Sequence, residues 1–303
     1  MYQAPILLMT YRRYENTKYI LSLLIKFNQK KIYIFNDGLK SKLHSKDHQK
    51  TRNFLKDFKK KNPLVKLILP KKNLTQKNNL PYAIDQVFKK NEMVNILEDD
   101  CIPSKDYFKF TNILLNKFKN DLRIGQISGV NLINHRGYKR RNDDSYFFSK
   151  FTSSWGWATW RNRWQIDYDR NIKLWPKIKK ENWLNDILIN KNSVNFWEKY
   201  LDRRFKLLDD DWDKPWTFSN FINNRLSIYP SKNLIKNIGE DKYAIHKNPK
   251  KWNNIKIEKI KFPLKHPKII VQDFSADNFI TKEGYSNPPF LYRIKNRILR
   301  EFK

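Results

Sequence analysis

Apolar and polar residues along the first 130 positions follow two patterns in turn. Short apolar runs are typical of buried strands, and the segments after them repeat apolar residues every three or four positions, as one face of a helix does. These patterns predict strands at 4–10, 31–35, 64–69, 93–97 and 123–129, and helices at 16–27, 45–60, 81–90 and 104–118. Strand–helix units in series build a mainly parallel sheet. We therefore expect an α/β fold with a mostly parallel central sheet flanked by helices.

The remainder of the chain is patterned less regularly. Residues 166–208 are mostly helical in pattern, and short strands are predicted at 146–148 and 226–230. Residues 134–144 are polar and basic, which is typical of a loop. We expect this part to add a helix-rich region to the sheet.

The strand at 93–97 leads directly into three consecutive carboxylates, Glu98, Asp99 and Asp100. Ligands of open α/β sheets bind at the carboxyl ends of the strands. Three adjacent acids repel one another, and a hard divalent cation removes that cost, with a bound diphosphate supplying further oxygen ligands. A solvated acidic turn before the next helix is the simpler alternative. The apolar run in front of the triplet, which fixes it at a strand end, favours the ligand site.

Two other strand ends carry candidate binding residues. Arg12 lies in the basic turn after the first strand, where a cation beside the N–H groups of a helix start suits a phosphate. An exposed basic loop explains Arg12 equally well. Asp37 ends the second strand and is placed to accept a hydrogen bond from a base or ribose, although Asn-Asp-Gly is also an ordinary turn.

The densest aromatic segment is Trp-Gly-Trp-Ala-Thr-Trp at 155–160. Aromatic residues most often belong to the core, because they bury large apolar areas. Three tryptophans around a glycine, beside serines and a threonine, also resemble a wall on which sugars stack. Both interpretations stay open at this point.

A second acidic cluster stands out because the chain is so basic. Four acids occur within the five residues 209–213, and tryptophans flank them. A positioned, partly desolvated carboxylate is a good proton acceptor. We favour Asp213 as a general base because the flanking tryptophans and Pro215 fix its position. An acid of the run 209–211 is near enough to act instead, although such a run is usually solvated.

Composition narrows the classes of partner. Lys and Arg number 62 against 30 Asp and Glu, a net charge of +32, which attracts nucleic acid, anionic membranes or acidic ligands. The excess is mainly Lys scattered among Asn and Ile, as compositional drift in an AT-rich genome produces, and no nucleic-acid module is visible. We therefore expect no nucleic acid partner. Neither a Walker A motif nor Gly-x-Gly-x-x-Gly occurs, which argues against P-loop and dinucleotide chemistry.

The single cysteine, Cys101, excludes an internal disulfide and a multi-cysteine zinc site. No apolar stretch approaches the length that crosses a bilayer, and no leader peptide is visible. We expect a cytoplasmic protein. The tail at 292–303 mixes Lys and Arg with Leu, Ile and Phe, as basic amphipathic segments do, so peripheral contact with the inner face of an anionic membrane is also expected.

Six segments follow one another in an order that is typical of one protein family: 4–12, 35–38, 96–103, 155–160, 212–216 and 237–239. They resemble bacterial sugar transferases of the GT-A fold, which are nucleotide-diphospho-sugar transferases. These enzymes are distantly similar to the N-acetylglucosaminyltransferase that initiates complex N-glycans. The resemblance covers roughly residues 3–247 and is most specific at 98–100 and 155–160.

The resemblance implies a metal-dependent, hexosyltransferase-like glycosyltransferase of surface polysaccharide synthesis. It would move a sugar, with inversion, from a nucleotide-diphosphate donor to a hydroxyl of a glycan or glycolipid. Residues 1–130 would bind the nucleotide sugar, 131–250 would form the sugar and acceptor half of the same domain, and 251–303 would be a basic C-terminal extension. The alternative, from another class, is a non-catalytic carbohydrate- or polyanion-binding protein.

The resemblance also implies roles for individual residues. Asp100 and His246 would hold Mn²⁺ or Mg²⁺, and Asp213 would be the catalytic base. The donor would be contacted by a larger set of residues at strand ends and in the aromatic segment: Thr10, Arg12, Asp37, Glu98, Asp99, Trp155, Gly156 and Trp157. The chain has Thr75 where the family commonly has a glycine, so donor contacts from that loop are not carried over.

Overall fold

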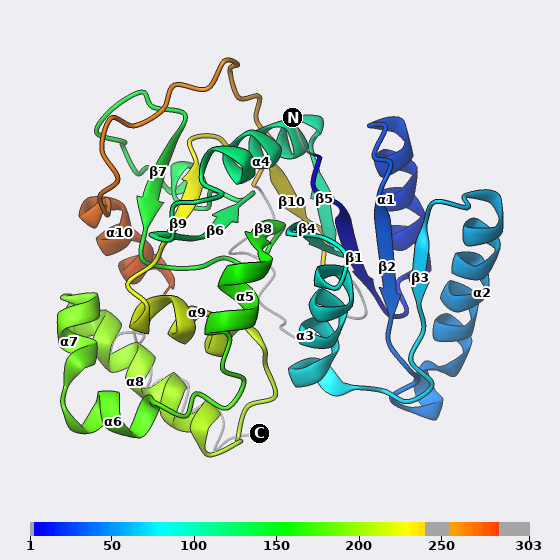
Figure 1. Ribbon diagram of the computed structural model, residues 1–303, viewed down its shortest axis with the longest axis horizontal. Coiled ribbons are helices and arrows are strands. Elements are labelled where there is room, and N and C mark those ends of the chain that lie inside the picture. Colours follow the sequence, from blue (N-terminus) through cyan, green and yellow to red (C-terminus); the bar gives the residue numbers. More distant parts are fainter. Residues whose placement is uncertain (1–2, 240–254, 285–303) are drawn as a thin grey trace, which may run out of the picture.

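The computed structural model describes residues 3–239 and 255–284, and a sheet of eight strands organises it (Figure 1). The strand order is β3-β2-β1-β4-β8-β6-β9-β7. In chain order these strands are β1 (Ile6–Thr10), β2 (Ile32–Asn36), β3 (Lys66–Ile68), β4 (Met93–Glu98), β6 (Ile124–Ser128), β7 (Tyr146–Ser149), β8 (Trp157–Trp160) and β9 (Leu226–Pro230). Two short strands, β5 (Cys101–Pro103) and β10 (Ile235–Asn237), form a separate antiparallel pair.

Four of the seven strand pairs in the large sheet are parallel, so the predicted α/β fold with a mostly parallel sheet is confirmed. Strands β1 to β4 are all parallel to one another. Strand β8 runs antiparallel between β4 and β6, and β7 runs antiparallel to β9 at the sheet edge. The carboxyl ends of β1, β2 and β4 therefore meet at one edge.

Helices pack on both faces of the sheet because successive residues of each buried strand point to opposite sides. In β1, Ile6 and Leu8 join a core cluster with residues of α1 and α4, whereas Leu7 and Met9 join one with α3 and buried tryptophans. The helices of this part are α1 (Tyr14–Lys26), α2 (Ser45–Lys61), α3 (Thr75–Phe88), α4 (Lys105–Lys117) and α5 (Arg161–Asp167), with a 3₁₀ turn at Lys42–His44.

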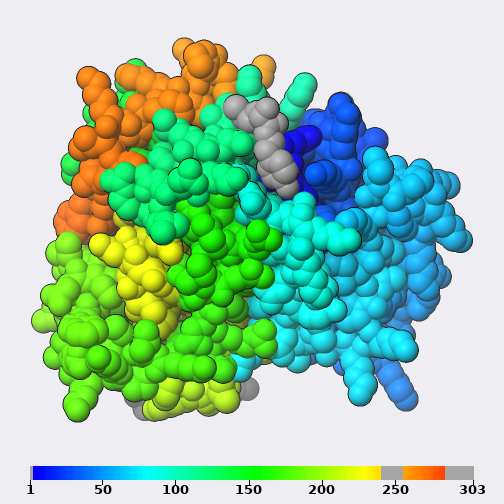
Figure 2. All heavy atoms as spheres, in the orientation of Figure 1, coloured from blue at the N-terminus to red at the C-terminus, as the bar shows by residue number. Residues whose placement is uncertain are grey.

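The predicted helical region at 166–208 is also present. It contains α6 (Trp175–Lys180), α7 (Trp183–Leu188) and α8 (Lys191–Phe205), and α9 (Asp213–Ile222) follows it. These helices share a third apolar cluster that includes Trp175, Trp197, Phe218 and Phe221. In the space-filling view this region is the yellow-green part at the lower left (Figure 2).

The described part of the C-terminal segment belongs to the fold. Gln272 forms a bridge with Phe148 of β7, and α10 (Phe274–Gly284) follows it. Asp277 anchors α10: its carboxylate accepts hydrogen bonds from the Lys150 N–H at 2.8 Å and from Gln272 Nε2 at 2.7 Å. Burial raises the pKa of Asp277 to about 6. Residues 255–284 are therefore more than an appended extension, while the predicted amphipathic tail at 292–303 lies outside the described residues.

Candidate active site

The acid triplet lies at the carboxyl end of β4, beside the loop that follows β1. Asp99 accepts hydrogen bonds from the Tyr11 N–H at 3.1 Å and from Arg13 Nη1 at 3.1 Å. The same Arg13 nitrogen lies 3.1 Å from Asp100 Oδ2. The arginine at the triplet is thus Arg13, which sequence reasoning missed in favour of its neighbour Arg12. The pattern of residues around a helix start does not show which of two adjacent arginines turns inward.

The triplet carries more negative charge than its described surroundings neutralise. Burial, together with the carboxylates of Asp100, Asp99 and Asp213, raises the pKa of Glu98 to about 8 against the effect of Arg13. Burial also raises the pKa of Asp99 to about 6, although Arg13 opposes this shift. The second acidic cluster, far away in sequence, lies near the triplet, because Trp212 beside Asp213 stacks on Trp157, which is paired with Ile96 of β4.

The surroundings of Asp100 fit a hard cation in part. Ile238 donates its N–H to the Asp100 carbonyl at 2.8 Å, and a Cβ on Gly239 would lie 2.5 Å from Asp100 Oδ2. Only glycine therefore lets this turn approach the carboxylate so closely. Among residues 3–239 and 255–284, no three His, Cys, Asp or Glu side chains form a group that could hold a metal. A single carboxylate still suits Mg²⁺ when phosphates and waters supply the other ligands.

His246, the second predicted metal ligand, lies outside the described residues. Thr10 and Arg12, predicted as donor contacts, lie after β1. Thr10 ties β1 to β2: its hydroxyl donates to the Phe35 carbonyl at 2.9 Å and accepts from Asn36 Nδ2 at 3.1 Å. Arg12 acts on the other side of its loop. Burial lowers the pKa of His44, and the positive charge of Arg12 lowers it further.

Asp37, the predicted base contact, holds the loop before α3 in place. Its Oδ1 accepts the N–H of Gly38 at 2.8 Å and that of Leu74 at 3.0 Å, and its Oδ2 accepts from Asn73 Nδ2 at 3.1 Å. Burial raises the pKa of Asp37, against the effect of these hydrogen bonds. The carboxylate therefore orders the loop at the edge where β1, β2 and β4 end.

Replacing Thr75 in this loop by glycine is expected to stabilise the protein. Thr75 has a φ of 64°, and the left-handed region costs an ordinary residue about 1–2 kcal/mol, whereas glycine adopts it freely. After the larger entropy loss of glycine, we expect the free energy of unfolding to rise by about 0.5–1 kcal/mol in urea titrations. Thr75→Ala is the control, because it also removes the hydroxyl but keeps the strain. An equal gain in both variants would assign the effect to the hydroxyl.

The aromatic segment divides between core and cavity. Trp157 and Trp160 are fully buried in β8, and Trp157 stacks on Trp212 with ring centroids 5.5 Å apart. The side chains of Trp157 and Trp160 thus belong to the core and do not form a surface on which a sugar stacks. Gly156 has a φ of 60°, and a Cβ there would lie 2.6 Å from Ile235, so a glycine is required. Trp155 is half-buried and lines the main cavity.

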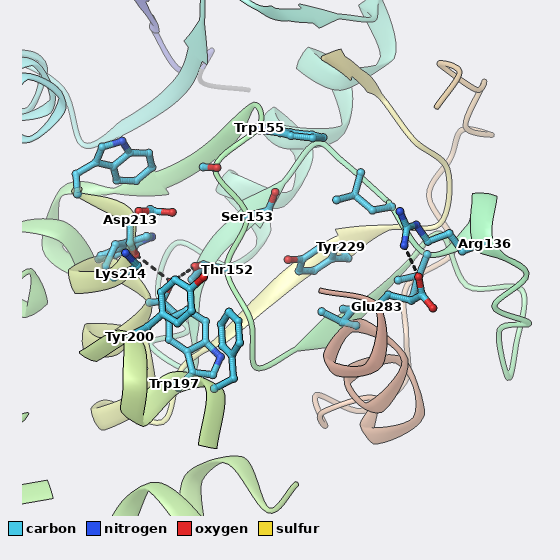
Figure 3. Close-up of a pocket in the computed structure, with 18 residues that line it drawn as sticks. Arg136, Thr152, Ser153, Trp155, Trp197, Tyr200, Asp213, Lys214, Tyr229 and Glu283 are labelled. Atoms are coloured by element: carbon cyan, nitrogen blue, oxygen red, sulfur yellow. Dashed lines mark hydrogen bonds and ion pairs between the residues drawn. The ribbon is translucent and has the colours of Figure 1, made fainter. Parts of the chain in front are cut away.

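This cavity has a volume of about 320 Å³ and is mainly apolar (Figure 3). Residues from the 3₁₀ turn Asn134–Arg136, the segment before β8, and helices α8, α9 and α10 enclose it. Its aromatic lining residues are Trp155, Phe196, Trp197, Tyr200, Trp212, Trp216 and Tyr229. Pockets of this size, apolar with a few placed polar groups, are typical small-molecule sites.

Asp213 is one of two carboxylates that line this cavity, and the other is Glu283. Asp213 begins α9, and its side chain is open to the cavity rather than packed against protein. The cavity walls nevertheless displace surrounding water, and this burial, with the charge of Asp211, raises the pKa of Asp213. No ion pair joins Asp213 to another side chain in the part of the chain that the structure describes. These are properties of a proton acceptor.

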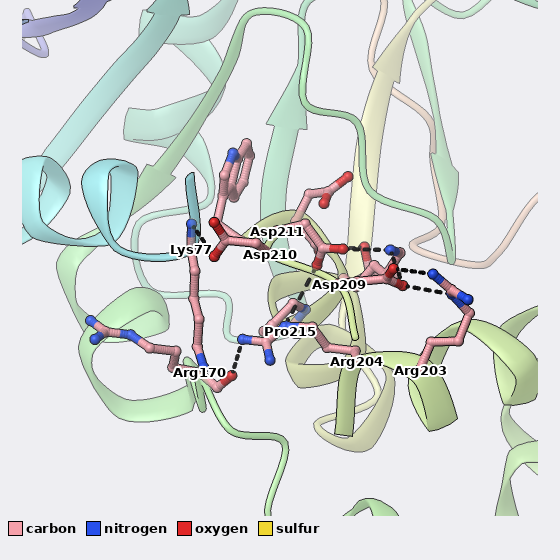
Figure 4. Close-up of polar contacts among 12 residues, drawn as sticks. Lys77, Arg170, Arg203, Arg204, Asp209, Asp210, Asp211 and Pro215 are labelled. Carbon is pink, nitrogen blue, oxygen red and sulfur yellow. Dashed lines mark hydrogen bonds and ion pairs between the residues drawn. The ribbon is translucent and has the colours of Figure 1, made fainter. Parts of the chain in front are cut away.

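The neighbouring aspartates are held by other groups (Figure 4). Asp209 pairs with Arg203 at 2.7 Å and with Lys214 at 3.1 Å. Asp211 pairs with Lys214 and lies 3.6 Å from Arg204 Nε. Asp210 turns away and accepts the N–H of Lys77 at 3.2 Å. The run 209–211 thus fixes the loop that carries Asp213, which supports the choice of Asp213 made from the sequence.

No protein-family profile matches the chain, and no curated protein matches it either. Solved structures with related backbones include 4-diphosphocytidyl-2C-methyl-D-erythritol synthase from Anaerococcus prevotii DSM 20548, with a TM-score of 0.38 and 11% identity over 77% of this chain and 92% of that one. A UDP-glucose pyrophosphorylase complexed with UDP-glucose has a TM-score of 0.38 and 10% identity, and the match covers 75% of this chain and 90% of that one. The glycosyltransferase GlyE of Streptococcus pneumoniae TIGR4 has a TM-score of 0.29 and 10% identity, and the match covers 95% of this chain and 66% of that one. Likenesses this remote identify neither family nor activity, so the function is argued from the site.

Proposed function

We propose that the protein is a metal-dependent glycosyltransferase that moves a sugar from a nucleotide-diphosphate donor to an acceptor hydroxyl, with inversion. One observation carries the proposal. The triplet Glu98 to Asp100 and the cavity-facing Asp213 come from distant segments, yet Trp212, next to Asp213, stacks on Trp157 of β8, and β8 pairs with β4, the strand that leads into the triplet. Such a site has one set of acids for a donor complex and a separate acid for proton transfer.

The donor is proposed to lie where β1, β2 and β4 end. Arg13 and Asp100 would meet its diphosphate, with Asp100 holding Mn²⁺ or Mg²⁺ together with the phosphates. The ion would supply positive charge that stabilises the nucleoside diphosphate as it leaves. Arg13 contributes a fixed charge of the same sign, because its guanidinium is already held by Asp99.

The acceptor is proposed to enter the aromatic cavity. Aromatic rings bind the apolar faces of sugars, and the few polar groups of the cavity orient the hydroxyls. Asp213 would accept the proton of the attacking hydroxyl, and its raised pKa increases its proton affinity. The oxygen freed of its proton attacks the anomeric carbon, the bond to the diphosphate breaks, and the electron pair leaves with the diphosphate.

A glycan or glycolipid acceptor, a role in surface glycan synthesis and peripheral contact with the inner face of the membrane are parts of the same proposal. In the part of the chain that the structure describes, no helix is long and apolar enough to cross a membrane. The charge of +32 supports attraction to an anionic surface.

A panel of nucleotide sugars tests the proposed function. With Mn²⁺ present, we expect one class of nucleotide sugar to raise the melting temperature, because a ligand that binds only the native state stabilises it. The same compound should be hydrolysed slowly when water replaces the acceptor. A non-catalytic carbohydrate-binding protein would hydrolyse none of them. If no member of the panel stabilises the protein and none is hydrolysed, the proposal is contradicted.

A further inference from the structure

The cavity beside Asp213 has a second polar end. Arg136, from the 3₁₀ turn, and Glu283, from α10, form an ion pair there. Both line the cavity, and their side chains are 17% and 32% exposed, so they are partly open to whatever fills it. Figure 3 shows this pair and Asp213 at opposite ends, with Tyr229 between them.

This separation bears on the length of the ligand. A hydroxyl that reacts must lie at Asp213, because proton transfer needs hydrogen-bond contact. A group that contacts Arg136 and Glu283 lies beyond Tyr229, and therefore belongs to a different part of the ligand. Aromatic side chains form the wall between the two ends, and such faces suit pyranose rings. The arrangement fits two or more sugar rings in a row.

The charges of the cavity bear on the kind of sugar. Its charged lining residues are Arg136, Asp213, Lys214 and Glu283. Glu283 neutralises Arg136, and Asp209 with Asp211 neutralises Lys214. Asp213 adds a negative charge. An acidic sugar would meet repulsion from Asp213, whereas the paired guanidinium and carboxylate offer both donors and acceptors to neutral hydroxyls.

We propose that the cavity binds the acceptor as a neutral glycan of at least two sugar rings, and that Arg136 and Glu283 recognise the ring beyond the one that reacts. This inference rests on the proposed function. It gives α10, which lies beyond the segment that resembles sugar transferases, the role of completing the acceptor site. The anchor at Asp277 holds α10 against β7 and so fixes the position of Glu283.

An array of immobilised neutral and acidic glycans, from one ring upward, tests the inference. The full-length protein is applied with Mn²⁺ and UDP, GDP or ADP. We expect binding to neutral glycans of two or more rings, and about a tenfold or greater loss of affinity in Glu283→Gln, since the hydrogen bonds that this residue accepts are no longer to a charged group and the ion pair with Arg136 is broken. Glu15→Gln is the matched control, because it breaks an exposed ion pair with Lys50 on the opposite part of the chain.

A second variant separates recognition from folding. Arg136→Glu combined with Glu283→Arg keeps an ion pair and the packing of α10 but reverses the donors and acceptors. We expect it to melt near the wild-type temperature and to lose glycan binding. Wild-type binding in either cavity variant, preference for acidic or single-ring glycans, or no binding to any glycan would overturn the inference. Hydrolysis of the donor by the wild type needs no acceptor. If the wild type hydrolyses the donor but the glycan results fail, only this inference is overturned and the proposed function stands.

Discussion

Replacing Asp213 by asparagine is expected to lower kcat by ~10²-fold or more, the scale for loss of a positioned general base. The affinity for the nucleotide sugar should hardly change, because Asp213 faces the cavity proposed for the acceptor, whereas the diphosphate is proposed to lie at Arg13 and Asp100. Steady-state turnover and donor binding by calorimetry measure the two quantities separately. Asparagine keeps the size of the side chain, so a fall in kcat is not explained by an altered cavity.

Asp210→Asn is the control for this substitution. It removes a charge from the same loop, but Asp210 points toward α3, where it accepts the N–H of Lys77. Its turnover should stay near that of the wild type. Full turnover in Asp213→Asn, together with loss in Asp211→Asn, would show that the base lies two residues earlier.

The pH dependence offers an independent check on the base. Burial raises the pKa of Asp213 above its ordinary value of 3.8. A base acts only when deprotonated, so turnover should rise with pH through that raised pKa and level off above it. In Asp213→Asn this acidic limb should disappear from the residual activity.

Replacing Asp100 by asparagine is expected to remove the metal-dependent part of donor binding. A neutral amide is a poor ligand for a hard cation, and Arg13 loses one of its two carboxylate partners at the triplet. Replacing a residue that only hydrogen-bonds to a metal ligand lowers metal affinity or activity by about 10–100-fold. We therefore expect the loss of a ligand itself to weaken donor binding by at least ~10-fold. Calorimetry with Mn²⁺ and with chelator measures the difference.

The matched control for this change is Asp57→Asn on α2, which removes the same charge from an exposed pair with Lys60. Its donor binding should keep its full response to Mn²⁺. Near-native melting temperatures in both variants exclude unfolding as the cause. An unchanged response to Mn²⁺ in Asp100→Asn would remove this residue from the metal site.

Local patterns predicted the parallel half of the sheet well. Its strands are continuous apolar runs, and its helices repeat apolar residues on one face, so each element is specified by its own residues. The position of β8 was not predicted, because pairing with β4 and β6 depends on residues distant in the chain. The same is true of α10, whose residues 274–284 carry no motif and become part of a site only through packing.

The position of the acid triplet was predicted: it lies at a strand end, as its apolar run indicated. For Asp213 the sequence predicted a fixed, partly desolvated carboxylate, but it did not predict the cavity that this residue faces. The two interpretations of the aromatic segment could not be separated, because the sequence does not show where the strand begins. The strand β8 begins at Trp157, which is buried, whereas Trp155 precedes the strand and lines the cavity.

The placement of β8 has a consequence for how the chain is made. One edge of β4 is bonded to β1 and the other to β8, which lies about sixty residues later. Until those residues leave the ribosome, an apolar strand at 93–98 has an unpaired edge, which other chains can join. A fragment that ends at residue 130 keeps this edge permanently open. Residues 1–130 are therefore expected to aggregate when they are produced alone, and β8 is the strand that prevents this in the whole chain.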